Sequence, residues 1–166
     1  ARTLGLDESQ IRKGLETYTG VKRRFDYQIK SDRLVYIDDY AHHPAELRAC
    51  ISSAKELYPG KSVTGIFQPH LFTRTRDFAK GFAESLSLLD RLILLDIYPA
   101  RELPIPGVTS EMILEMVTCP LKVLLPKDQV LDYLRQAPLD VLLTLGAGDI
   151  DQLVDPIRQT FSTHSS

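Results

Sequence analysis

The chain has 166 residues, 43% hydrophobic and 25% charged, which is enough for one buried core and too short for two ordinary domains. Its formal net charge of -2 and its scattered basic residues exclude the charge pattern of a general nucleic-acid binder. No apolar run approaches the ~20 residues that cross a bilayer, and Cys50 and Cys119 lack disulfide-framework or zinc spacing, so we expect a cytoplasmic protein without a membrane segment.

A short lead-in helix is predicted at the start of the chain. Asp7 and Gln10 have the spacing of a capping box, and Ile11 with Leu15 supplies an apolar face. The absence of a starting methionine suggests a piece of a longer protein. We therefore expect residues 1–20 to lead in from an upstream central domain, and the whole chain to form a single domain.

Strand-like and helix-like segments alternate along the rest of the chain. Phe25–Ile29 and Leu34–Ile37 flank a polar turn, which predicts a hairpin, and the apolar run Leu92–Ile97 predicts a central, buried strand. Pro44 suits the first turn of a helix. The same periodicities predict, in chain order, a helix carrying Leu47, Cys50, Ile51, Ala54, Leu57 and Tyr58, a strand at Val63–Phe67, a helix carrying Phe78, Phe82, Leu86 and Leu89, a helix at Ser110–Val117, a strand at Lys122–Leu125, a helix at Lys127–Gln136, a strand at Val141–Leu145 and a last helix after Gly148.

This alternation predicts an α/β fold. Strands joined by right-handed helical crossovers form a Rossmann-like, mostly parallel sheet with helices on both faces, here opened by a short antiparallel strand or hairpin. Such folds host many functions, so the fold identifies no chemistry. It does indicate that ligands bind beyond the carboxyl ends of the strands.

The first loop at such a strand end is rich in chemically useful side chains, namely Asp38, Asp39, Tyr40, His42 and His43. A carboxylate there can accept ribose hydroxyls, and an imidazole can orient an amine or a carboxylate near neutral pH. Alternatively, an aspartate caps the loop and the histidines satisfy backbone groups. A zinc site of Asp39, His42 and His43 is disfavoured because a third, spaced ligand is missing.

The next strand end carries two arginines. Arg74 and Arg76 stand just before the helix that carries Phe78, where main-chain amides favour anions, so this end can hold a carboxylate or a phosphate. A solvated ion pair with Asp77 or Glu84 is the preferred interpretation of Arg76. Arg74 is therefore the better candidate ligand.

Two further loops follow later strands. Gly146–Ile150 lacks the GxGxxG spacing of a dinucleotide site, and predicts a tight strand-to-helix turn with Asp149 near a helix N-terminus. The proline-stiffened loop Tyr98–Gly107 either lines the crevice or forms a rigid surface loop. Both alternatives stay open for that loop.

Four ordered segments resemble one enzyme family. DDYAHHP at 38–44, FQPHLFTRTRD at 67–77, DIYPARELPIPGVTS at 96–110 and LGAGDI at 145–150 resemble the C-terminal domain of the UDP-N-acetylmuramate:L-alanine ligases. The likeness covers essentially the whole chain. The murein-tripeptide recycling ligases are similar in the His-His-Pro loop but usually lack a TRTRD-like segment, so they remain an alternative that the second segment disfavours.

The resemblance implies a three-domain enzyme of peptidoglycan precursor synthesis. Such an enzyme uses ATP and Mg2+ to phosphorylate the carboxylate of UDP-N-acetylmuramate, and the amine of L-alanine then attacks the acyl phosphate. Its partners would be these substrates and its own N-terminal and central domains, with no nucleic acid and no membrane. The tetrahedral step needs positioned positive charge and hydrogen-bond donors.

The resemblance also implies roles for individual residues. Arg24 and Asp39 match positions that contact ATP, with Asp39 at the ribose. Tyr40, His42 and Arg74 match positions that line the site where alanine meets the acyl group, His42 and Arg74 being the candidate catalytic residues. Two further candidate substrate-binding residues are His43 and His70.

The chain departs from the family in two places. Leu71 stands where members often have arginine, and Ala100-Arg101-Glu102 where they often have AGE. The chain also has no GxxxxGK[ST] phosphate loop and no central-domain Mg2+ ligands. We therefore expect no metal site in it and no ligation by this chain alone.

A freestanding Rossmann-like module that binds a nucleotide or small acid without catalysis is the competing hypothesis. A glycine-rich first strand-to-helix turn would favour such a module. The turn here is acidic and rich in histidine, which favours the ligase domain.

Overall fold

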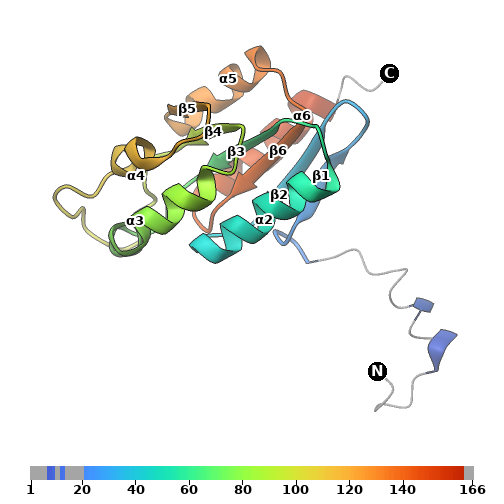
Figure 1. Ribbon diagram of the computed structural model, residues 1–166, viewed down its shortest axis with the longest axis horizontal. Helices are drawn as coiled ribbons and strands as arrows, with labels where there is room; N and C mark the ends of the chain where they lie inside the picture. The colour runs from blue at the N-terminus through green and yellow to red at the C-terminus, as the bar shows by residue number, and fades with distance from the viewer. Residues whose placement is uncertain (1–6, 10–11, 14–20, 163–166) are drawn as a thin grey trace.

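The computed structural model describes residues 7–9, 12–13 and 21–162. Most of the lead-in helix expected over residues 1–20 lies outside the described residues. Figure 1 shows the body of the molecule as a twisted sheet between two layers of helices. No helix in these described ranges is both long enough and apolar enough to span a bilayer.

Six strands of the described chain form one sheet in the order β1-β2-β6-β3-β4-β5. Only β1 is antiparallel to its neighbour, which confirms the predicted hairpin and the mostly parallel Rossmann-like sheet. The strands are β1 (Asp26–Lys30), β2 (Val35–Asp39), β3 (Val63–Phe67), β4 (Arg91–Leu94), β5 (Leu121–Leu124) and β6 (Val141–Leu145).

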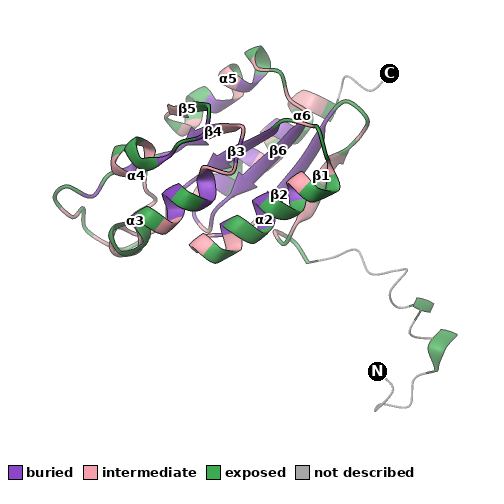
Figure 2. Cartoon of the chain, in the orientation of Figure 1, coloured by how far each residue is buried: buried purple, intermediate pink, exposed green. Residues whose placement is uncertain are grey.

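Helices cover both faces of the sheet, as predicted. Along β2, Val35 and Ile37 pack in one apolar cluster and Tyr36 in the other, because successive side chains of a strand point to opposite faces. Figure 2 shows the purple, buried strands between helices whose outer sides are exposed. One face carries α2 (Pro44–Leu57), α3 (Phe72–Leu86) and α4 (Ser110–Met116), and the other carries α5 (Val130–Gln136) and α6 (Val154–Ser162), preceded by the short 3-10 helices η2 (Lys127–Gln129) and η3 (Asp149–Leu153).

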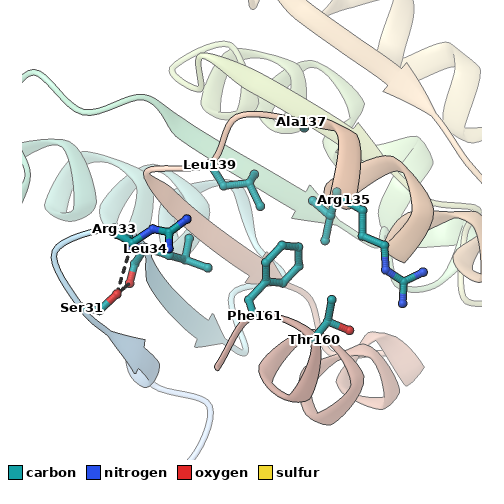
Figure 3. Close-up of a pocket in the computed structure, with 9 residues that line it drawn as sticks. Ser31, Arg33, Leu34, Arg135, Ala137, Leu139, Thr160 and Phe161 are labelled. Atoms are coloured by element: carbon teal, nitrogen blue, oxygen red, sulfur yellow. Dashed lines mark hydrogen bonds between the residues drawn. The ribbon is translucent and has the colours of Figure 1, made fainter. Parts of the chain in front are cut away.

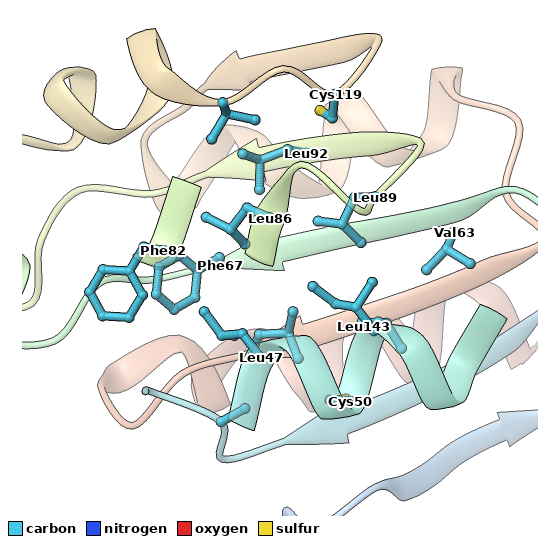
Figure 4. Packing of buried hydrophobic residues seen from close by; sticks show 14 of the residues in the cluster. Leu47, Cys50, Val63, Phe67, Phe82, Leu86, Leu89, Leu92, Cys119 and Leu143 are labelled. Atoms are coloured by element: carbon cyan, nitrogen blue, oxygen red, sulfur yellow. The ribbon is translucent and has the colours of Figure 1, made fainter. Parts of the chain in front are cut away.

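Helix α2 illustrates how the local pattern sets an element. Leu47, Cys50, Ile51 and Ala54 recur at helical spacing and pack on the sheet, as Figure 4 shows for Leu47 and Cys50. Leu57, which was expected on the same helical face, is 57% exposed. Leu57 lies at the border of this face, in the last turn of the helix.

The expectation that Leu92–Ile97 forms the central strand is partly wrong. β4 ends at Leu94 and is buried, but β6 and β3 occupy the middle of the sheet. The chain returns from β5 through α5 on the opposite face and inserts β6 between β2 and β3. Sequence order alone cannot reveal that insertion.

The register brings the carboxyl ends of the parallel strands together. Asp39 and Phe67 both pair with Leu145, and Leu94 pairs with both Phe67 and Leu124. The loops after β2, β3, β4, β5 and β6 therefore open at one edge of the sheet, where ligands of such folds bind. We call it the carboxyl edge.

Candidate functional site

Two neighbouring aspartates at the end of β2 have different environments. Asp38 is 1% exposed and accepts hydrogen bonds from the Thr144 hydroxyl at 2.6 Å and from Arg23 Nε at 3.2 Å. Burial raises the pKa of the Asp38 carboxyl, although Thr144 and Arg23 oppose the shift. Asp39 accepts from the amides of Phe25 and Ala41 at 2.7 and 2.8 Å. Asp39 therefore stabilises the local backbone through these two hydrogen bonds. Each of its oxygens still has a second lone pair that can accept another hydrogen bond.

His42 and Tyr40 lie against each other beyond Asp39. Their rings are edge to face at 5.1 Å, and His42 Nδ1 lies 2.9 Å from the carbonyl of Tyr40. Because a carbonyl only accepts, Nδ1 of His42 is the donor in this contact, and the carboxylate of Glu46 also lies 3.4 Å from Nδ1. When the ring is neutral, Nε2 is then its acceptor. The guanidinium of Arg24 lies 5.9 Å from the Tyr40 ring. The structure thus brings together three of the predicted site residues.

His43 has the geometry of a helix cap. It is the N-cap of α2, and its Nδ1 accepts from the amide of Ala45 at 3.4 Å. Glu46 completes the capping box by accepting from the amides of His42 and His43. The His43 ring also packs on Phe78 with 4.7 Å between centroids. For this residue the structure agrees with the backbone-satisfying alternative.

His70, after β3, stacks on Tyr98, after β4. Their rings are 5.6 Å apart with an interplanar angle of 19°. The amide of Leu71 donates to the Tyr98 carbonyl at 2.9 Å, and the amide of Tyr98 donates to that of Pro69 at 2.8 Å. The start of the proline-stiffened loop therefore lines the carboxyl edge, whereas Leu103 at its tip is 84% exposed.

His70 is also short of a hydrogen bond. Its Nδ1 is buried and finds no partner among the described residues. Burial lowers the pKa of the His70 imidazole, and the positive charges of Arg74 and His42 lower it further. His42 follows β2, whereas His70 and Arg74 follow β3, and both strands end at the carboxyl edge. A buried nitrogen without a partner is a candidate contact for a ligand.

Arg74 is half-buried and makes no ion pair within the described ranges, whereas Arg76 is bound to Asp77 at 2.8 Å and is over half exposed. The preference for an ion pair at Arg76 is confirmed. The expectation that both arginines precede the helix is wrong, because α3 already begins at Phe72. Arg74 lies in its first turn.

The early start of α3 has a tertiary cause. Leu71 precedes the helix with a φ of 72°, and it offers no capping side chain. Glu102, from the loop after β4, instead accepts from the amide of Thr73 at 2.9 Å and from its hydroxyl at 2.5 Å. This contact caps the helix from a residue 29 positions away, which no local pattern reveals.

The turn after β6 matches its prediction and adds residues that the sequence analysis missed. Gly146 has a φ of 147°, a region that favours glycine, and Asp149 begins η3. The buried Gln68 donates to Asp149 at 2.8 Å and accepts from the amide of Ile150 at 2.9 Å. Lys127 also donates to Asp149. The only signal for Gln68 was a polar residue directly after a buried strand.

Asp149→Asn tests this turn. Burial would raise the pKa of Asp149, but hydrogen bonds from Lys127 and Gln68 outweigh it and lower the pKa. A carboxyl group whose pKa is lower in the folded than in the unfolded protein stabilises the fold at pH values above its unfolded-state pKa. This stabilisation is lost as pH falls through the folded-state pKa. We expect Asp149→Asn to reduce the unfolding free energy by about 1 kcal/mol at pH 7. Urea unfolding of both chains should show this difference disappearing as pH falls below the usual carboxyl range, and an equal difference at every pH would contradict the role of the charge.

The described residues contain no group of three or more histidines, cysteines, aspartates or glutamates that could hold a metal ion. Three aspartates at the carboxyl edge already have hydrogen-bond partners. Asp38 binds Arg23 and Thr144, Asp39 binds backbone amides, and Asp149 binds Lys127. These residues do not fit a Mg2+ site.

A hollow of about 460 Å3 lies at the opposite edge of the sheet (Figure 3). Its lining comes from the β1–β2 turn, the segment between α5 and β6, and the end of α6, with Leu34, Leu139 and Phe161 among its walls. None of the predicted site residues lines it. The convergence of charged, aromatic and unpaired groups makes the carboxyl edge the better candidate site.

Comparisons with known proteins agree with the fold and the motifs. The family described as Mur ligase, glutamate ligase domain, matches residues 23–148. The UDP-N-acetylmuramate--L-alanine ligase of Parabacteroides distasonis is 59% identical over 155 residues, which cover 93% of this chain and 34% of that protein. This chain therefore spans about a third of the length of that relative.

Solved structures give the same outline. The crystal structure of UDP-N-acetylmuramate-alanine ligase from Thermotoga maritima matches with a TM-score of 0.78 and 25% identity, covering 98% of this chain and 35% of that one. A murein peptide ligase from Psychrobacter arcticus matches with a TM-score of 0.65 and 16% identity, covering 96% and 34%. The second likeness supports the fold alone.

Proposed function

The chain belongs to the Mur ligase family, as its C-terminal domain, and from this premise we propose that it is part of an ATP-dependent ligase that joins L-alanine to UDP-N-acetylmuramate. The observation that carries the proposal is that Tyr40 and His42 after β2, and His70 and Arg74 after β3, lie at the same edge of the sheet. Arg74 makes no ion pair within the described residues. The chain is also 59% identical to a protein named for this reaction.

In the proposed reaction, the muramate carboxylate takes the terminal phosphoryl group of ATP and becomes an acyl phosphate, and ADP leaves. The amine of L-alanine attacks the acyl carbon, the amide bond forms, and phosphate leaves with the electrons of the broken C–O bond and takes up the proton that the amine loses. Phosphorylation is needed because a free carboxylate is a poor acceptor for an amine. The remaining work is to position the reactants and stabilise developing negative charge.

The residues of this chain bind and orient the reactants in this proposal. Arg74 pairs with the alanine carboxylate or the acyl phosphate, since its guanidinium has no protein partner within the described residues. His42 accepts a hydrogen bond through Nε2, and Tyr40 lies beside it. His70, stacked on Tyr98 at the same edge, is a further proposed substrate contact. His43 supports His42 by capping α2.

Arg24 and Asp39 form the proposed nucleotide contact. Arg24 is exposed beside the Tyr40 ring, where it can reach a phosphate. Asp39 can accept a ribose hydroxyl with its free lone pairs while it holds the amides of Phe25 and Ala41. Mg2+ would stabilise the charge of the phosphates, and we assign the phosphate loop and most of the Mg2+ ligands to the central domain of a longer cytoplasmic protein.

The test is ligation by the longer protein that contains this chain. We expect ATP-dependent phosphate release that requires both UDP-N-acetylmuramate and L-alanine. Release with the muramate but independent of alanine would contradict the proposed amino acid. A native coding sequence that starts near residue 1 would favour the freestanding binding module instead.

The 166-residue chain by itself should bind ATP with a dissociation constant of about 1 mM or weaker, because the groups that grip triphosphate and Mg2+ are assigned elsewhere. It should form no amide. Calorimetric titration of the chain with ATP, beside an assay for ligated product, measures both. Micromolar affinity or detectable ligation would show that the site is more complete than proposed.

A further inference from the structure

Two consecutive arginines in the segment before β1 have opposite environments. The Arg23 side chain is 22% exposed and turns onto the carboxyl edge, whereas Arg24 is exposed. Both guanidinium groups lie near the ring of Tyr40, at 5.0 Å and 5.9 Å from its centroid. The proposed nucleotide contact uses Arg24, so the inward position of Arg23 calls for its own explanation.

The Arg23 guanidinium ties three parts of the fold together. Its Nε donates to Asp38 at the end of β2 at 3.2 Å, and its Nη2 donates to the carbonyl of Gly146 after β6 at 2.6 Å. Its Nη1 lies 3.9 Å from a carboxylate oxygen of Asp151 in η3. A planar guanidinium can serve several acceptors at once, which an ammonium group at the end of a flexible stem cannot do equally well.

The backbone around Arg24 is held in a strained shape. Arg23 and Phe25 have φ values of 59° and 47°, in the left-handed region that is unfavourable for residues other than glycine. The amide of Tyr40 donates to the Arg23 carbonyl at 2.7 Å, and the amide of Phe25 donates to Asp39 at 2.7 Å. Such strain persists only where surrounding contacts enforce it.

We propose that Arg23 is a positioning residue, which enforces this strained turn and so holds Arg24 and Tyr40 in place for the nucleotide. The inference rests on the proposed nucleotide role of Arg24. Arg23 touches no reactant and acts through Asp38 and Gly146. Without the hydrogen bonds of the Arg23 guanidinium to Asp38 and Gly146 the turn relaxes. The guanidinium of Arg24 is then no longer fixed beside Tyr40.

A double-mutant cycle in the full-length protein tests the coupling, with ATP affinity measured by calorimetric titration. We expect Arg24→Ala to weaken ATP binding about tenfold in the native background. In an Arg23→Met background, Arg24→Ala should weaken ATP binding less than about twofold, because the Arg24 side chain is already misplaced there. A tenfold cost in both backgrounds would show that Arg23 has a merely structural role and would overturn the inference.

Arg23→Lys gives the cycle a second, milder background in case Arg23→Met does not fold. Lysine retains the positive charge facing Asp38 but lacks the planar guanidinium. In this background Arg24→Ala should therefore weaken ATP binding only about threefold. An undiminished tenfold cost there would overturn the inference. The ATP titration contains no alanine, so failure of alanine-dependent ligation in the native protein is a separate result that counts against the proposed function.

Discussion

Replacing Arg74 by alanine in the full-length ligase is expected to lower kcat/KM for ligation about a hundredfold, which corresponds to about 3 kcal/mol of lost transition-state stabilisation. Arg74 is half-buried in the first turn of α3, beside His70, and has no protein partner among the described residues. Loss of a charge-assisted and partly desolvated contact has a cost of this size. Steady-state kinetics with varied L-alanine at saturating ATP measure it.

Arg76→Ala is the matched control, two residues further along the same helix. Arg76 binds Asp77 in solvent, so its removal should change kcat/KM less than about threefold. The parameter that responds to Arg74→Ala separates its possible roles. A raised KM for alanine indicates carboxylate binding, and a lowered kcat indicates stabilisation of the transition state. Small and equal effects of both substitutions would contradict the placement of Arg74 in the site.

Gly148→Ala is expected to reduce the unfolding free energy of the chain by about 3 kcal/mol, the upper part of the usual range for overpacking. An added methyl group would lie 2.5 Å from Gln68 Oε1 and 2.8 Å from Tyr98 Cβ. Gln68 is buried and hydrogen bonded at both ends of its amide, so it cannot move aside without loss. Tyr98 stacks on His70, so ligation by the full-length protein should fall as well.

Gly107→Ala supplies the control for the Gly148 substitution. Gly107 has a φ of 78° and nothing within 4 Å of an added methyl group, so its substitution should cost only about 1 kcal/mol of backbone strain. Gly148 has a φ of -84°, which any residue adopts, so its cost is steric alone. Denaturant unfolding of both variants measures the difference. Equal losses would show that the contact of Gly148 with Gln68 is looser than the structure indicates.

The candidate site was recognisable from its motifs, but the roles within it were not. Position after a strand favoured Arg74, and the family resemblance singled out His42. The sequence left open whether His43 binds a ligand or satisfies backbone groups, and in the structure its ring caps α2 and packs on Phe78. Arg23 was not selected from the sequence, because two adjacent arginines cannot be distinguished until their environments are known.

The sequence by itself determined the kinds of element and placed their bounds to within a few residues, because hydrophobic period and turn chemistry are local properties of the chain. The strands at Val63–Phe67 and Val141–Leu145 were predicted without error. Only the tertiary structure decided that β6 lies between β2 and β3, that Glu102 caps α3, and that Arg23 reaches the carbonyl of Gly146, 123 positions along the chain. These contacts form where crossovers bring distant segments to one edge of the sheet, and a local pattern contains no information about which distant group will arrive there.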